Sequence, residues 1–537
     1  MNKLCDDTNN LILSFFIEPI SITNDKLYLN NDIYFLYLTS KYWNNTINHY
    51  IEQNYQNVDV EFENKKEYAC LNGHVNILEW LKNYECLQKT YWENNIDAIE
   101  YACSNGHVNI LDWWKNNENI YSFDYDEDAV RLASREGHIN VLEWFKHSEY
   151  EFKYDDCAIS EASAQGQIDV LEWFINSGYE FKYDDCAMSE ASEQGRINVL
   201  EWFKHSGYEL KYNIIDVVNS SSIFKMIDSL NWWLNLCKNR EYEFKYNENA
   251  IKLASQHGNV DVLDWWWKLC KNSEYEFKYN KFAIINASEK GHVNVLEWFK
   301  NSEYEFKYDE HAINWASGKG HVNVLEWFKN SEYEFKYNEN AINYASLNGH
   351  VNILEWWLNL CKNSEYEFKY DEDAINWASG NGHINVLEWW LKNSEYEFNY
   401  DIDAITNASG NGHVNVLEWF LNNKVLQYSD RSLINASKNG HVNILEWWWN
   451  LHKSSDNGKL CDVIYKEIVN YQEDMIREVC INGHTDVLEW WVILCKKMGY
   501  ELLYCNYMIN LASESGHIDM LEWFKNSDYE FNYDSNA

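Results

Sequence analysis

Proline is almost absent from this chain of 537 residues, since Pro19 is its only one. The absence excludes collagen-like segments, proline-rich linkers and most loop-rich folds, and it leaves helices uninterrupted. The polar, acidic start of the sequence lacks the basic residues and apolar core of a secretory signal. The longest apolar runs, near 11–17 and 265–267, are far shorter than the ~20 residues that a membrane span needs.

Basic residues are also scarce. The chain has 44 Lys and Arg against 85 Asp and Glu, which gives a formal net charge of −41. A chain this acidic repels phosphate backbones and anionic lipid surfaces, so we expect neither nucleic acid nor a membrane as its partner. None of the 13 cysteines forms a CxxC pair. Scattered thiols of this kind indicate an intracellular, reducing compartment.

What the sequence has in abundance is one repeated pattern. Aromatic residues make up 17% of the chain, with 28 Trp among them, and most belong to copies of a motif that ends in Gly-His-Val-Asn-Val-Leu-Glu-Trp. Its glycine recurs at positions 73, 106, 137, 166, 195, 258, 291, 320, 349, 382, 412, 440, 483 and 516. A spacing near 30 residues is typical of a supersecondary unit that is stacked into a solenoid.

Each unit is predicted to contain two helices around the glycine. In the first helix of one good copy, Asp373 is a helix-capping residue, and helical spacing places Trp377 among the buried side chains and Asn376 with Ser379 on the opposite side. Gly382 ends this helix, because a tight turn needs a residue with positive φ. The second helix is apolar around most of its circumference and therefore needs neighbours on both sides.

The links between units alternate aromatic and charged residues, as in Tyr304-Glu305-Phe306-Lys307-Tyr308. This period of two is strand-like, and we expect the aromatic side to cover the helix ends while the charged side faces water.

The motif resembles the ankyrin repeat. The segment 373–383 aligns without gaps with that family's Thr-Pro-Leu-His-x-Ala-Ala-x-x-Gly-His, and Ala378, Gly382 and His383 match outright. The Asn-, Tyr- and Trp-rich copies are similar to the ankyrin-repeat families of amoeba-infecting giant viruses. The resemblance implies an all-α ankyrin-repeat solenoid of stacked helix-turn-helix units with short connecting links.

The implied function is a non-catalytic protein–protein interaction scaffold, encoded by a virus and acting on host proteins. Because opposite charges aid encounter, we expect protein partners with a basic surface. The candidate binding residues are acidic and lie in the links: Glu305, Asp309, Glu310, Glu334, Glu367, Asp371, Glu372 and Glu397.

No enzyme, metal or cofactor is expected. Eleven of the 17 histidines follow the turn glycine, and a catalytic residue is needed once rather than eleven times, so these histidines are predicted to be part of the scaffold. No cysteine has a local partner for nucleophilic catalysis, and no phosphate-binding glycine loop follows a strand.

Two regions depart from the repeat. Residues 1–61 do not repeat, and the segment Tyr34–Trp43 resembles the end of an F-box, which implies an adaptor that recruits targets to a ubiquitin ligase through residues 1–60. The alternative is an N-terminal cap on the first repeat. Residues 62–537 hold about fifteen repeats, with a degenerate copy at 213–235 and an insertion near 452–470. A structural or decaying repeat expansion without a specific partner is the third functional reading.

Overall fold

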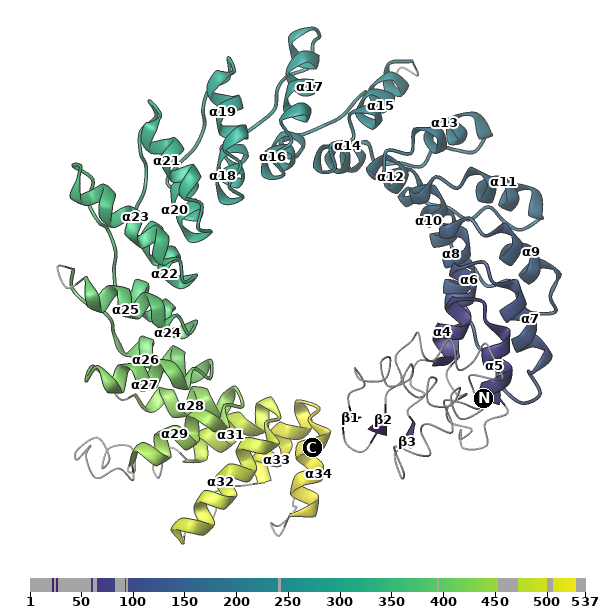
Figure 1. Cartoon of the computed structure of the whole chain (residues 1–537). Helices are drawn as coiled ribbons and strands as arrows, with labels where there is room; N and C mark the ends of the chain where they lie inside the picture. Colours follow the sequence, from purple (N-terminus) through teal and green to yellow (C-terminus); the bar gives the residue numbers. More distant parts are fainter. Residues whose placement is uncertain are drawn as a thin grey trace, which may run out of the picture. The chain divides into compact units, whose positions relative to one another are not determined.

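The computed structural model describes residues 22–23, 26–27, 59–60, 65–82, 92, 95–239, 243–393, 396–427, 429–452, 472–499 and 506–527. These residues form fifteen helix pairs, which confirms an all-α repeat solenoid (Figure 1). The chain divides into two units, 1–250 and 251–537. Within each unit the first helices of the pairs form one layer and the second helices form the other (Figure 1).

The helices are bounded as follows. The first helices are α4 (Lys65–Leu71), α6 (Ile96–Ser104), α8 (Glu127–Glu136), α10 (Cys157–Gln165), α12 (Cys186–Glu193), α14 (Ile214–Ile223), α16 (Glu248–Gln256), α18 (Phe282–Glu289), α20 (His311–Gly318), α22 (Asn340–Leu347), α24 (Asp373–Gly380), α26 (Ile402–Gly410), α28 (Asp430–Lys438), α31 (Gln472–Asn482) and α33 (Asn506–Glu514). The second helices are α5 (Val75–Lys82), α7 (Val108–Asn116), α9 (Ile139–His147), α11 (Ile168–Ser177), α13 (Ile197–Ser206), α15 (Ile227–Asn239), α17 (Val260–Lys271), α19 (Val293–Asn301), α21 (Val322–Asn330), α23 (Val351–Lys362), α25 (Ile384–Lys392), α27 (Val414–Asn422), α29 (Val442–His452), α32 (Thr485–Met498) and α34 (Ile518–Asn526).

Three strands of two residues each precede the repeats. Strand β1 (Ile22–Thr23) pairs antiparallel with β2 (Lys26–Leu27), and β2 pairs in parallel with β3 (Asp59–Val60). The rest of segment 1–61, including the F-box-like stretch, lies outside the described residues, as does the insertion near 452–470 except for its first residue.

The Gly-His-Val-Asn motif joins one repeat to the next. Gly73 ends its helix with φ +71°, and the imidazole of the following repeat, His107, lies against it. His107 Nε2 lies 3.1 Å from the Leu71 carbonyl oxygen, and Asn109 Nδ2 donates to the Gly73 carbonyl at 2.9 Å. His138 makes the same contact with Ser104, and His517 makes it with Ile481, so the histidine bonds the helix end of the preceding repeat in several copies.

The Leu-Glu-Trp motif makes a second contact between repeats. Trp327 Nε1 donates to Glu297 of the preceding repeat at 2.8 Å, and Trp356 Nε1 donates to Glu326 at 2.5 Å. Trp327, the first aromatic residue of α21, is half-exposed. The next residue, Phe328, is buried together with Leu325. The second aromatic position therefore forms the core, and the first ties neighbouring second helices together.

The links are extended but pair with no strand in the described residues. Phe306 stacks on Trp327 at 5.4 Å and on the next link's Tyr333 at 4.1 Å between ring centroids. The aromatic side thus covers the end of the following second helix. Lys307 lies 4.5 Å from the ring centroid of Tyr279 in the preceding link, so the charged side chains also contact neighbouring repeats.

The predicted orientation of the first helix is wrong. Asn376 is only 3% exposed and Ser379 is fully buried, whereas Trp377 is half-exposed. The reason is a contact with the next repeat, because Asn376 Nδ2 donates to Asp401 Oδ1 at 2.8 Å and a buried amide needs such a partner.

The degenerate copy keeps the helix pair. Lys225 occupies the turn position that glycine holds elsewhere and has φ +61°, between α14 and α15. A side chain in this conformation costs about 1–2 kcal/mol. Among the helices that the structure describes, none is long and apolar enough to cross a membrane.

Candidate functional site

The eight acidic residues predicted to bind a partner fall into two structural sets. Four occupy equivalent positions in four links, and their side chains are exposed: Glu305, Glu334, Glu367 and Glu397. Their backbone carbonyls accept hydrogen bonds from tyrosine hydroxyls of the preceding link, such as Tyr337 to Glu367 at 2.7 Å and Tyr370 to Glu397 at 3.0 Å. Each residue belongs to a different repeat, so the four do not form one cluster.

The other four begin first helices. Asp309 accepts from the backbone N–H of His311 at 3.1 Å, and Asp371 does the same for Asp373. Glu310 and Glu372 are the cap residues of α20 and α24. The assignment of these eight residues as binding residues stays a prediction, and the structure gives each of them a place in the contacts within the solenoid.

Electrostatics at Asp309 fit a structural ion pair. Its Oδ2 lies 2.6 Å from Lys281 Nζ of the preceding repeat. Partial burial raises the pKa of Asp309, but the hydrogen bonds from Lys281 and His311 outweigh it and hold that pKa below its ordinary value.

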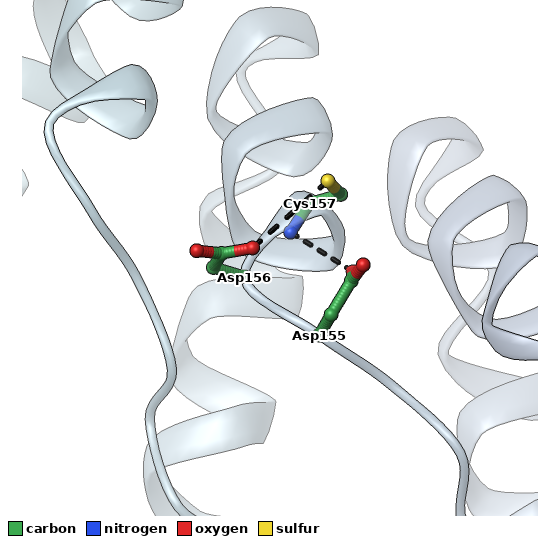
Figure 2. A group of neighbouring side chains, drawn as sticks. All are labelled: Asp155, Asp156 and Cys157. Atoms are coloured by element: carbon green, nitrogen blue, oxygen red, sulfur yellow. Dashed lines mark hydrogen bonds between the residues drawn. The ribbon is translucent and has the colours of Figure 1, made fainter.

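Groups of potential metal ligands also lie at helix starts. Asp155, Asp156 and Cys157 lie together at the start of α10, and Figure 2 shows that Asp155 accepts from the Cys157 backbone N–H, at 3.0 Å. Burial and the two carboxylates raise the pKa of the Cys157 thiol, so it stays protonated at neutral pH. The same arrangement recurs at 184–186, and its role in both copies is capping.

A different set of side chains forms a column along the first helices. Each member lies five residues before the turn residue, directly before a buried residue, and is itself half-exposed or exposed. The residue type changes from repeat to repeat: Tyr68, Tyr101, Leu132, Glu161, Glu190, Ser220, Leu253, Asn286, Trp315, Tyr344, Trp377, Asn407, Asn435, Glu478 and Leu511. We call this set the variable column. Its members lie outside the core, and some of them contact a neighbouring repeat, as Glu161 does with Arg131 at 2.9 Å.

Three consecutive members of the variable column are aromatic. Trp315, Tyr344 and Trp377 come from α20, α22 and α24, and the rings of Tyr344 and Trp377 stack at 5.8 Å with an interplanar angle of 14°. We call these three residues the aromatic column. Flat rings held parallel and half-exposed are a platform on which another flat ring can stack.

A pocket of about 310 Å³ opens beside the aromatic column. It is lined by residues of α18, α20, α22 and the turns that follow them: Glu289, Trp315, Gly318, Lys319, Tyr344, Leu347 and Asn348. Gly318 lets the neighbouring helix approach, because a Cβ there would lie 2.7 Å from Tyr344 Cβ. The pocket therefore combines two aromatic walls with a carboxylate, an ammonium and an amide.

The acidity of the chain does not extend to this layer. The first helices α18, α20, α22, α24, α26 and α28, with the residue after each, hold four acidic and four basic residues. By contrast, the four links 302–310, 331–339, 364–372 and 394–401 hold fourteen acidic residues against three lysines. The negative charge is thus concentrated in the links.

The variable column was not predicted from the sequence, although a signal for it was present. The position differs between repeats while its neighbours Ala and Ser recur, and such alternation indicates an exposed site inside a packed helix. Trp377 was assigned to the core because its helix is too short for the apolar pattern to define one buried face.

Comparison with solved structures gives matches to pentatricopeptide repeat proteins. PPR10 from maize matches over 94% of this chain and 79% of its own length, at 12% sequence identity and a TM-score of 0.29. A substituted form of PPR10 in complex with an 18-nt PSAJ RNA element matches over 94% of this chain and 84% of that chain, at 12% identity and a TM-score of 0.30. No family model matches the chain, and no curated protein matches it.

These findings correct the identification as an ankyrin-repeat protein of the giant-virus type, because the matched repeats are pentatricopeptide repeats. Several solenoids share a period near 30 residues, so the spacing alone did not distinguish them. The sequence predicts no catalytic role, and neither matched structure is described as an enzyme.

The comparison also corrects the predicted partners. We expected a protein scaffold or ligase adaptor with basic protein partners and no nucleic acid, whereas one matched structure holds RNA. The prediction used the net charge of the whole chain, and net charge does not describe the potential of one face. At this identity and TM-score the likeness concerns the helical repeat fold alone, and it carries no function over to this chain.

Proposed function

We propose that this chain is a non-catalytic repeat protein that binds single-stranded RNA along the first-helix layer of its second unit. The observation that carries the proposal is the aromatic column, in which Trp315, Tyr344 and Trp377 occupy one position in three consecutive repeats. Unpaired bases stack on such side chains, and one base per helical repeat is a known mode of RNA recognition. The RNA in the matched PPR10 complex is a property of that protein.

The distribution of charge supports the proposal. Balanced charge on the first helices α18 to α28 removes the local repulsion that the acidic links exert on phosphates. Because few cations are available to displace counterions, the contact depends on stacking and on hydrogen bonds to bases. Basic RNA-binding proteins lose affinity steeply as salt rises. Here we expect affinity that stays constant or increases with salt, since salt screens the repulsion from the links.

The proposal is tested by fluorescence anisotropy of a labelled single-stranded RNA with the full chain. Stacking is worth about 1–3 kcal/mol per base, so Trp377→Leu should weaken binding roughly 5- to 150-fold. Trp327→Leu is the matched control, because Trp327 is equally half-exposed but lies in the second-helix layer. Equal losses in both variants, or no RNA binding by the wild-type chain, would reject the proposal.

We further propose a reducing compartment. The nine cysteines in the described part of the chain form no disulfide, and burial raises the pKa of Cys70 to about 12. Burial also raises the pKa of its neighbour Cys103. Protonated, buried thiols resist oxidation, and alkylation of the native and the unfolded chain would count the thiols that each state protects.

We also propose that the repeat array begins near residue 62 and that residues 1–61 form a separate segment that caps the first repeat. The helix pairs from α4 onward support this boundary, and so does the pairing of β3 with β2 at the end of that segment.

A further inference from the structure

We infer that the pocket between α18, α20 and α22 is a guanine-binding site. The inference rests on the proposed function and adds to it the identity of one base. The pocket lies beside the aromatic column, has a volume of about 310 Å³ and is lined by both apolar and polar groups. The polar groups that line the pocket therefore restrict which planar ring can bind in it.

The walls of the pocket suit a planar ring. Trp315 and Tyr344 come from neighbouring first helices and supply two aromatic surfaces, and Leu347 adds an aliphatic one. Gly318 has no side chain, which allows α20 and α22 to pack closely at this wall, because a Cβ at position 318 would collide with Tyr344. A base inserted here contacts aromatic rings, as in other proteins that bind unstacked bases.

Two of the polar side chains of the pocket, Glu289 and Asn348, supply acceptor oxygens. The Asn348 amide donates its Nδ2 hydrogen to the Tyr344 carbonyl at 2.9 Å, so its Oδ1 is left to accept. Glu289 is an acceptor with a side chain 24% exposed, and its ion pair with Lys290, at 3.6 Å, is longer than a hydrogen bond. Lys319 is the one cationic donor among the lining residues.

Guanine fits this set better than the other bases do. Its Watson–Crick edge presents two adjacent donors, N1–H and the N2 amino group, beside the acceptor O6. A carboxylate accepts from both donors at once, and an ammonium donates to O6. Adenine and cytosine each present one amino group beside ring acceptors, and uracil presents one N–H between two carbonyls. Against the carboxylate of Glu289, which has no hydrogen to donate, those acceptors would be left unpaired, which costs binding free energy.

The same residues argue for one competing ligand. A carboxylate beside aromatic rings also binds quaternary ammonium groups. Lys319 favours the base, because a second cation in the pocket repels an ammonium ligand and pairs with a carbonyl oxygen.

The first experiment uses the full chain and labelled oligouridines that carry one central G, A, C or U. A well-formed two-point contact to a base gives about 1–3 kcal/mol of discrimination, so the G-containing RNA should bind about 5- to 150-fold more tightly than the others. Glu289→Gln should reduce this preference to less than twofold. Glu193→Gln is the matched control, since Glu193 holds the same position in its repeat, two residues before the turn glycine, beside no aromatic member of the variable column.

The second experiment separates this inference from the proposed function. Binding of the free monophosphates GMP, AMP, CMP and UMP is followed by ligand-observed NMR with wild type, Glu289→Gln and Trp315→Leu. If the wild-type chain prefers GMP and both variants lose this preference, the result supports the pocket even when no RNA binds. RNA binding without preference for G, or preference that Glu289→Gln retains, overturns the guanine site and leaves the RNA proposal standing. Displacement of GMP by tetramethylammonium at millimolar concentration would also overturn it, because the pocket would then bind cations.

Discussion

At the scale of single residues, the turn glycine and the histidine beside it have one shared function. The glycine needs positive φ, and it also needs no side chain, because the imidazole of the next repeat occupies the space where a Cβ would lie. The two requirements coincide in every Gly-His copy whose next repeat also supplies histidine. The positive φ and the lack of space for a Cβ together explain why Gly and His recur side by side without any catalytic role.

The two requirements can be separated by substitution. Gly178 has φ +88° and open space around it. Gly178→Ala therefore incurs only the conformational penalty and should lower the free energy of unfolding by about 1–2 kcal/mol. Gly349→Ala has φ +75° and would also place a Cβ 2.8 Å from His383 Nδ1. We expect it to cost about 1–3 kcal/mol more, the usual penalty of overpacking. Urea unfolding of the two variants measures the difference, and equal costs would contradict the proposed contact.

At the scale of helices, burial alternates between the two aromatic positions of Leu-Glu-Trp-Phe. Phe328 is 1% exposed and packs inside α21, whereas Trp327 is half-exposed and held by Glu297. Each repeat contacts only its neighbours, so the loss of one core side chain weakens two interfaces.

Phe328→Ala should therefore destabilise its region more than Trp327→Ala does, although tryptophan is larger. Removal of the buried ring costs about 3–5 kcal/mol. Removal of the half-exposed indole should cost about 1–2 kcal/mol, near the average for point substitutions. Hydrogen exchange of the amides in α21 and its neighbours would measure both local effects. A larger loss of protection in Trp327→Ala would show that the indole, not the phenyl ring, forms the core.

Sequence periodicity was sufficient to predict the helix pairs, the glycine turn and the solenoid. It was not sufficient for the faces of the first helix, because neighbouring repeats bury both sides of it. Asn376 is buried since it bonds Asp401 of the next repeat, and no pattern within one copy reveals a partner 25 residues away. The pocket at Trp315 and Tyr344 was missed for the same reason, since its walls come from different repeats.

At the scale of the whole molecule, the histidines form a series of coupled groups within each unit. Partial burial lowers the pKa of His350, and the charges of His383 and His321 in the adjoining repeats lower it further. Burial is likewise the main cause that lowers the pKa of His383. Both imidazoles also keep a bond to the backbone of the preceding repeat, His350 to Gly318 and His383 to Leu347.

This series predicts that acid destabilises the solenoid. Because the pKa of each such histidine is lower in the folded chain than the ordinary 6.5, the unfolded chain binds more protons below pH 6.5 and stability falls as pH falls. Carboxylates with raised pKa, such as Asp373, have the opposite effect, so a control must isolate the imidazoles. The chain supplies it: Gln167 stands where histidine stands elsewhere and donates to the Arg135 carbonyl at 3.1 Å. We expect His350→Gln to keep this bond and to reduce the loss of thermal stability between pH 7.5 and 5.5. If the variant and the wild type lose stability equally, the acid sensitivity comes from other groups.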